Sequence, residues 1–165
     1  MAFIDEDMED SKYADFYNVS YGVGMGNRNW MEDVMLVQFF LHRIYLFDSD
    51  WNQYKPSGTL TVDGVSGPIT RRWILKFQSD CREDGDDISV DGIVDRAGNA
   101  ASNWESSIST TIYTIRYLNN IVRNGQNDFY RTMPYNQQVP PLLRLSFMRM
   151  NSEKPGANFP ITSGD

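Results

Sequence analysis

Leu60-Thr-Val-Asp63-Gly64-Val65-Ser66-Gly67-Pro68-Ile69-Thr70-Arg-Arg-Trp73-Ile74-Leu-Lys-Phe77-Gln78 is the stretch that decides the fold, because it predicts a tight turn leading directly into a helix. Asp63-Gly64 is a typical turn pair, since glycine accepts a positive φ without steric cost. Ser66 or Gly67 can cap the helix, and Pro68 suits its first turn, where a missing N–H costs nothing. Apolar residues then recur at helical spacing and give the helix a buried face: Ile69, Trp73, Ile74 and Phe77.

A second turn of the same type, Val90-Asp91-Gly92-Ile93-Val94, follows further along the chain. Apolar residues recur at helical spacing before the first turn and after the second, which predicts two more helices. The earlier helix has Asn29 as its predicted N-cap and carries Trp30, Val34, Val37, Leu41 and Ile44; the later one ends at Asn124-Gly125 and carries Ile108, Ile112, Ile115, Leu118 and Val122. Two turns of one type, each introducing a helix, indicate an architectural unit rather than a catalytic one.

The composition predicts a folded chain and excludes two classes of partner. The 165 residues suffice for one domain with extensions, and 41% of them are hydrophobic and 13% aromatic. A net charge of −7 disfavours binding to nucleic acid or to an anionic membrane, since both require basic residues. The first seven residues lack the pattern of a signal peptide, and no stretch has the length of a transmembrane helix. We therefore expect a protein that is synthesised in the cytoplasm.

Four pieces of the chain, taken in order, resemble the peptidoglycan-binding-like domain, a small three-helix module found beside bacterial and phage cell-wall hydrolases. Asp33-Val34-Met-Leu-Val37-Gln38-Phe-Phe-Leu41 is similar to the Val-x-x-Leu-Gln-x-x-Leu run of its first helix, and Thr114-Ile115-Arg-Tyr-Leu118-Asn119 is similar to its end. The two Asp-Gly turns, the first with the Phe-Gln helix that follows it, are the other pieces. The positions that match the family motif are Val34, Gln38, Leu41, Asp63, Gly64, Gly67, Thr70, Phe77, Gln78, Asp91 and Gly92.

This resemblance covers roughly residues 29–120 and implies a mainly α fold, with a small three-helix core and two Asp-Gly turns. The chain then divides into an acidic, aromatic arm (1–28), a helical domain (29–124) and a proline-rich extension (125–165). The resemblance implies that the motif positions build turns and helix faces rather than touch a ligand. Trp73 stands where the family commonly has a small residue, so helix packing or the ligand groove is expected to differ there.

Exposed aromatic residues are the candidates for contact with a saccharide. Trp51 and Tyr54 lie in a predicted loop at 46–59, and aromatic faces pack on the apolar faces of sugar rings. With Trp73, they form the predicted ligand-binding set. The alternative is that these aromatic residues anchor their own loop.

The sequence offers little for catalysis. His42 and Cys81 are the only histidine and cysteine, so they cannot supply a zinc site or a disulfide. They could in principle pair as base and nucleophile, but we expect Cys81 to be a buried thiol on the Trp73 helix and His42 to be a surface residue. Residues 80–91 fail the EF-hand pattern because Arg82 stands at the third ligand position; an irregular cation site remains an alternative to a solvated loop. We predict no catalytic residue, metal or cofactor.

The two ends of the chain are expected to act as arms, and the aromatic residues of the first arm predict that it packs either on its own domain or on a neighbour. Gly22-Val-Gly24-Met-Gly26 is predicted to be a flexible hinge, and Leu142–Met150 either a strand or a turn or two of helix. The acidic first segment and the mildly basic last one suit packing between copies. We therefore expect subunits of a larger assembly to dock through residues 1–28 and 126–165, with peptidoglycan as a ligand of the helical domain, and neither nucleic acid nor membrane as a partner.

Together these features favour a non-catalytic peptidoglycan-binding-like protein. The expected role is a structural or wall-contacting subunit of a larger particle, a phage tail or a phage-like contractile injection system, into which the chain is incorporated. One alternative is a free-standing wall-binding accessory module for a hydrolase. A small enzyme or a cation-binding protein is the least favoured alternative.

Overall fold

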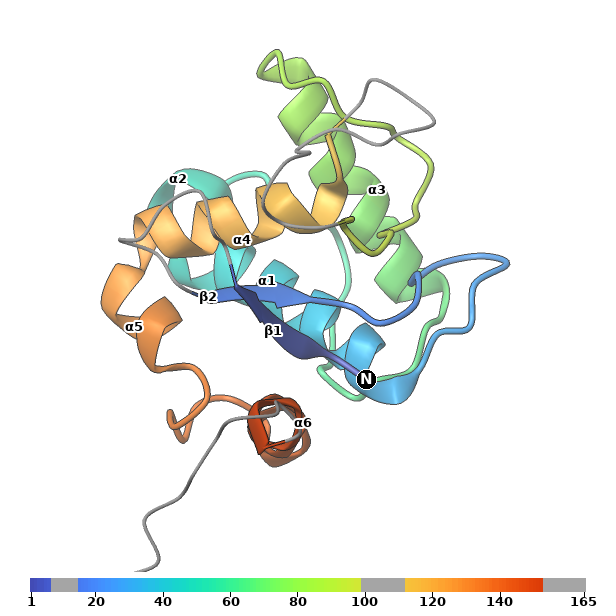
Figure 1. The fold of residues 1–165 in the computed structure, drawn as a ribbon. Helices are drawn as coiled ribbons and strands as arrows, with labels where there is room; N and C mark the ends of the chain where they lie inside the picture. Colours follow the sequence, from blue (N-terminus) through green and yellow to red (C-terminus); the bar gives the residue numbers. More distant parts are fainter. Residues whose placement is uncertain (7–14, 99–111, 153–165) are drawn as a thin grey trace, which may run out of the picture.

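The computed structural model describes residues 1–6, 15–98 and 112–152 and is mainly α-helical (Figure 1). A short hairpin precedes the helices, and its two strands are antiparallel, with Phe3 opposite Asn18 and Glu6 opposite Asp15. The elements in chain order are β1 (Phe3–Glu6), β2 (Asp15–Asn18), α1 (Met31–Phe47), α2 (Ser49–Asn52), α3 (Pro68–Glu83), α4 (Thr114–Gly125), α5 (Asn127–Thr132) and α6 (Pro141–Ser152). In the described part of the chain, no helix is both long and apolar enough to cross a membrane.

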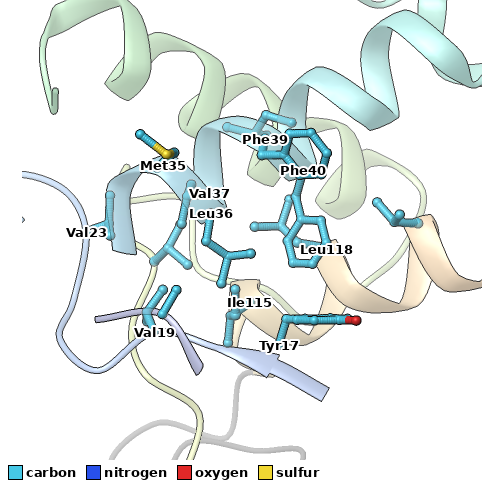
Figure 2. Packing of buried hydrophobic residues seen from close by; sticks show 14 of the residues in the cluster. Tyr17, Val19, Val23, Met35, Leu36, Val37, Phe39, Phe40, Ile115 and Leu118 are labelled. Carbon is cyan, nitrogen blue, oxygen red and sulfur yellow. The ribbon is translucent and has the colours of Figure 1, made fainter. Parts of the chain in front are cut away.

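Helix α1 is the centre of the core and contacts α2, α3, α4 and α6. The sequence predicts one buried stripe on this helix, yet Leu36, Phe40 and Tyr45 are also fully buried. These residues lie outside that stripe. Leu36 and Phe40 are buried because β2 and α4 cover a further face of the helix, as Figure 2 shows. Tyr45 is buried against Trp51 of α2 and Trp73 of α3. A helix that is apolar on most sides is typical of a core position.

The start of α1 differs from the prediction. The helix begins at Met31 with Trp30 as its N-cap, and no side-chain cap is present among the described residues. Asn29 instead has a positive φ of 50° and bonds back to the preceding loop. Trp30, expected in the apolar stripe, is 42% exposed because it precedes the helix.

Helix α3 follows the prediction except at Ile69, which was expected on the buried face but is 45% exposed in the first turn. Gly67 is its N-cap and Pro68 is its first residue, where the missing N–H costs no hydrogen bond. Trp73, Phe77 and Cys81 lie on its buried face, so the prediction of a buried thiol is confirmed.

The first segment packs into the same core rather than extending from it. Phe16, Tyr17, Val19 and Val23 are buried in the cluster that contains the α1 side chains. As far as it is described, this segment is therefore not an extended arm, and of its two expected packings, on its own domain or on a neighbour, the first is confirmed. Of its acidic residues, Asp7, Glu9 and Asp10 lie outside the described part.

The proline-rich segment also forms part of the core. Pro141 begins α6, a helix of 12 residues, so the helical alternative for this segment is confirmed, the strand alternative is wrong, and the helix is longer than the turn or two expected. Proline is tolerated there because the first turn of a helix needs no N–H donor. Tyr130, Met133, Leu143 and Phe147 from this segment are all buried in the same hydrophobic cluster. The expected extension is thus an integral layer of the fold as far as α6.

A buried polar network joins the hairpin to this C-terminal layer. Asn119 Oδ1 accepts from the Tyr17 N–H at 2.9 Å and from the Tyr130 hydroxyl at 2.6 Å, and Asn119 Nδ2 donates to the Tyr17 carbonyl at 2.9 Å. The Tyr17 hydroxyl donates to the Tyr130 carbonyl at 3.0 Å. Three segments far apart in the sequence therefore satisfy one another's buried polar groups, which rigidifies the core.

Helix α4 begins at Thr114, and the predicted apolar position Ile108 falls outside the described residues.

Candidate functional site

The first Asp-Gly turn is held by the side-chain amide of one glutamine. Gln38, on α1, accepts from the N–H groups of Asp63 and Gly64 at 3.1 and 2.8 Å. Its Nε2 donates to Asp63 Oδ1 at 2.9 Å, to the Val65 carbonyl at 3.1 Å and to Thr70 Oγ1 at 3.1 Å. Gln38 is 1% exposed, so its amide is shielded from water. The protein groups around it supply its hydrogen-bond partners instead.

The second turn is held in the same way by a second glutamine, which lies 40 residues after the first. Gln78, on α3, accepts from the N–H groups of Asp91 and Gly92 at 3.1 and 2.8 Å. Its Nε2 donates to Asp91 Oδ1 at 3.2 Å, to the Ile93 carbonyl at 2.8 Å and to Thr114 Oγ1 at 3.0 Å. Each clamp thus joins a helix, a turn and the first turn of the next helix. We call these two sets the Gln38 clamp and the Gln78 clamp.

The remaining motif positions support the same two turns. Gly64 and Gly92 have φ values of 75° and 76°, as predicted for turn glycines. A Cβ on Gly64 would lie 2.5 Å from Met31 Cγ, so the turn also packs closely on the start of α1. Val34, Leu41 and Phe77 are fully buried helix positions. Gly67 is the N-cap of α3. The motif residues therefore have structural contacts, as the sequence predicted.

The structure places Trp51 and Tyr54 beside a hollow of about 350 Å³. Acidic residues and one amide complete its lining: Asp50, Gln53, Asp80, Glu83 and Asp84. We call it the acidic hollow. Tyr54 is 51% exposed, whereas Trp51 stacks on Phe77 with ring centroids 5.5 Å apart. Trp51 therefore anchors its loop, as the alternative interpretation expected, and it also borders the hollow, so its contact with a saccharide stays a prediction.

One side of the acidic hollow is organised by Asp80. The Tyr45 hydroxyl donates to Asp80 Oδ2 at 2.7 Å, and Lys76 forms an ion pair with the other oxygen. Burial, with the neighbouring Asp80, raises the pKa of Tyr45, so the phenol remains a proton donor. Lys76 Nζ also lies 5.6 Å from the centre of the Tyr54 ring. An aromatic ring beside fixed carboxylates is a combination that can accept hydroxyl or amine donors while packing against an apolar face.

Trp73 does not belong to this set. It is 1% exposed, and its ring meets Tyr45 edge-on at 5.6 Å inside the core. The expectation that Trp73 contacts a ligand is therefore wrong, because α1 covers the face of α3 that carries it.

A second hollow, of about 660 Å³, lies at the other end of α3. Pro68, Arg71, Arg72 and Leu75 form one wall, and residues 24–29 contribute Gly24, Met25 and Asn29 to the other. We call it the arginine groove. Its lining is mostly apolar, with two guanidinium groups among the contacts. Nothing in the sequence analysis pointed to it, since its walls come from two segments, 24–29 and 66–75, that are distant in the sequence.

The loop that forms one wall of the arginine groove is tied down rather than hinged. Asn29 Oδ1 accepts from the Gly24 N–H at 2.8 Å, and Asn29 Nδ2 donates to the Gly24 and Asn27 carbonyls, both at 2.9 Å. Val23 forms an antiparallel bridge with Val94, with N–H to carbonyl distances of 2.9 and 2.8 Å. The predicted flexible hinge is therefore wrong, because these bonds join the loop to the second Asp-Gly turn.

Of the two residues considered for nucleophilic chemistry, Cys81 is the one that its surroundings make unsuitable. Burial and the nearby carboxylates raise the pKa of the Cys81 thiol, which keeps it protonated. Burial and the neighbouring Arg43 lower the pKa of the half-buried His42. Among residues 1–6, 15–98 and 112–152, no three His, Cys, Asp or Glu side chains converge as a metal site.

A comparison of the chain with family models, with curated proteins and with solved structures finds no match.

Proposed function

We propose that this chain is a non-catalytic peptidoglycan-binding-like protein that contacts the cell wall as part of a larger particle. The observation that carries the proposal is the pair of glutamine clamps. Gln38, Asp63, Gly64 and Thr70 are motif positions of the resembling family, and they meet in one hydrogen-bonded unit. The Gln78 clamp repeats the unit with the same geometry. This agreement between motif and contacts supports the family proposal beyond the sequence resemblance.

The acidic hollow is the proposed contact for the saccharide of the wall. Tyr54 offers an exposed ring, and Asp50, Gln53 and Glu83 offer side chains that can accept hydrogen bonds from sugar hydroxyls. Its volume of about 350 Å³ lies within the range of small-molecule sites. An open hollow beside a rigid helix suits binding of a polymer without cleavage of that polymer.

The test is co-sedimentation of the purified protein with insoluble peptidoglycan. The native chain is expected to pellet saturably, and Tyr54→Ala is expected to pellet less, since aromatic stacking on a ring contributes about 1 kcal/mol. Tyr135→Ala is the matched control, because Tyr135 is 75% exposed and does not line the acidic hollow. Equal pelleting of both variants and the native chain would remove the acidic hollow from the proposal. No pelleting of the native chain would overturn wall contact.

The outer face of α6 supports the particle part of the proposal. Leu142, Leu145 and Met148 follow one another at helical spacing and are 46%, 48% and 41% exposed. The opposite face of the same helix, with Leu143 and Phe147, is fully buried. A helix that is apolar on both faces is typical of an element covered on one side by its own chain and on the other by a neighbour.

Light scattering of the full chain tests this part. Leu145→Glu is expected to lower the mass of any multimer and leave the thermal midpoint unchanged, because Leu145 is exposed in the single chain. Thr132→Glu is the control, since it places the same charge at another exposed position outside the α6 stripe. A chain that is monomeric at all concentrations favours the free-standing wall-binding module instead.

A further inference from the structure

The arginine groove has a chemistry opposite to that of the acidic hollow. The two sites lie on one helix, with Arg71 and Arg72 twelve residues before Glu83 and Asp84. At 1.5 Å per residue, this is about 18 Å along α3. The acidic hollow therefore offers hydrogen-bond acceptors, whereas the arginine groove offers cationic hydrogen-bond donors beside an apolar wall.

Arg71 and Arg72 of the arginine groove form no ion pair within the described residues. The ion pairs of the described residues join the N-terminal amine to Asp33 and Lys76 to Asp80, and neither involves an arginine of the groove. Arg71 Nε is buried and makes no hydrogen bond within residues 1–6, 15–98 and 112–152. The stem of Arg71 lies against the second Asp-Gly turn, where a Cβ on Gly92 would lie 3.2 Å from Arg71 Cγ. The guanidinium is thus held at the groove by a stem that has little freedom to move away.

The rest of the groove presents apolar surface. Pro68 and Leu75 from α3 and Met25 from the opposite loop line it, and Met25 is 65% exposed. The amide of Asn29 is committed to the loop, because both of its polar atoms already bond to the backbone of residues 24–27. Arginine donors are therefore the charged recognition groups of the groove, and the fixed walls reduce the entropy cost of binding.

These features point to one occupant by charge complementarity. Guanidinium groups bind carboxylates with paired, charge-assisted hydrogen bonds, and an apolar wall beside them suits a small aliphatic side chain. A volume of about 660 Å³ accommodates a short peptide but not a folded partner. We infer that the arginine groove binds the free carboxylate end of a short peptide with small apolar side chains. This inference rests on the proposed function in one respect, namely that the peptide is the stem peptide of the cell wall rather than its glycan.

The test is a titration of the ¹⁵N-labelled full chain with N-acetyl-alanyl-alanine and with the same dipeptide as its carboxyl amide. The acid is expected to shift the amide signals of Gly24, Asn29 and Gly67, and the uncharged amide to bind about tenfold more weakly. Added salt is expected to weaken binding of the acid, since the contact with Arg72 is exposed to solvent. Shifts that are equal for both dipeptides, shifts confined to Tyr54 and its neighbours, or no shifts would each overturn the inference.

Substitutions then assign the contact to the arginines. Arg72→Gln is expected to weaken binding of the acid about tenfold with no loss of stability, because this side chain is exposed. Arg71→Lys keeps the charge and the stem, so the fold is retained, while the paired donor geometry is lost. Arg82→Gln is the matched control, as Arg82 is exposed on the same helix but does not line the groove. An Arg72→Gln chain that binds as tightly as the Arg82→Gln chain contradicts the inference.

The two proposals fail in different ways. A chain that pellets with peptidoglycan but does not bind the free dipeptide keeps the wall-binding function and loses the carboxylate site. A chain that binds the dipeptide through Arg72 but does not pellet keeps the carboxylate site and loses the wall as the source of the peptide.

Discussion

The Gln38 side chain and Asp63 are joined in both directions: Asp63 Oδ1 accepts from Gln38 Nε2 at 2.9 Å, and the Asp63 N–H donates to Gln38 Oε1 at 3.1 Å. The aspartate oxygen also accepts from the Val65 N–H at 2.9 Å, which closes the turn on itself. The turn is thereby connected to α1 from one side and to α3 from the other. The stability of the turn therefore depends on this reciprocal pair of hydrogen bonds.

Removing either glutamine is expected to destabilise the fold. Gln38→Ala leaves the buried Gly64 N–H without its acceptor, and each unsatisfied buried group costs about 1–3 kcal/mol. Gln78→Ala is expected to have a similar effect through Gly92. Urea denaturation measures the change in the free energy of unfolding. Gln53→Ala, at an exposed position, is the control and is expected to lie within about 0.5 kcal/mol of the native chain.

The turn glycine is expected to tolerate no side chain, for two reasons that can be separated. Gly64→Ala adds the strain of a positive φ, about 1–2 kcal/mol, and also places a Cβ 2.5 Å from Met31 Cγ and 2.8 Å from the Met31 carbonyl oxygen. Gly26 has a similar φ of 80°, but a Cβ there meets nothing within 4 Å among the described residues. Gly26→Ala therefore measures the strain alone. Thermal melts that show equal losses for both variants would argue against the close contact with Met31.

The Asp63 turn is expected to weaken in acid. Hydrogen bonds from the Val65 N–H and from Gln38 hold the pKa of Asp63 below its ordinary value of 3.8. A carboxyl group with a lowered folded pKa contributes stability that is complete above the ordinary pKa and is lost as the pH falls through the folded value. Asp63→Asn keeps an oxygen acceptor for both donors and removes the titration. Unfolding experiments at a series of pH values below 3.8 are expected to show a smaller loss for Asp63→Asn than for the native chain.

Truncation is expected to show that the C-terminal layer belongs to the domain. A chain that ends at Gly125 loses Tyr130 and Phe147, both buried, and with Tyr130 it loses the carbonyl that accepts from the Tyr17 hydroxyl and the hydroxyl that donates to Asn119. We expect this chain to lose its cooperative melt. A chain that ends at Ser152 keeps all the helices of the described residues and is expected to melt as the full chain does. A cooperative melt of the shorter chain would show instead that residues 29–124 fold alone, as the family resemblance implies.

Helix α3 and the two Asp-Gly turns were predictable because their signals are local. The spacing of Trp73 and Phe77, the proline at the start of α3 and the turn glycines each depend on a few neighbouring residues. Gln38 and Gln78 were identified through the family motif, and the hydrogen bonds that explain them became visible only with the fold. The start of α1 was mispredicted because a capping residue has a competing use: Asn29 bonds to its own loop rather than to the helix.

The sequence by itself determined a mainly α chain with two Asp-Gly turns, because hydrophobic periodicity and turn chemistry depend on short segments of the chain. The tertiary structure decided where the ends of the chain go, which aromatic residue is exposed and where hollows form. Trp51 and Tyr54 lie in the same predicted loop, and only the packing of Trp51 on Phe77 of α3 distinguishes it from Tyr54, which stays 51% exposed. The arginine groove likewise exists because the Val23–Val94 bridge brings a distant loop beside α3. Such contacts depend on long-range packing free energy, which no local pattern records.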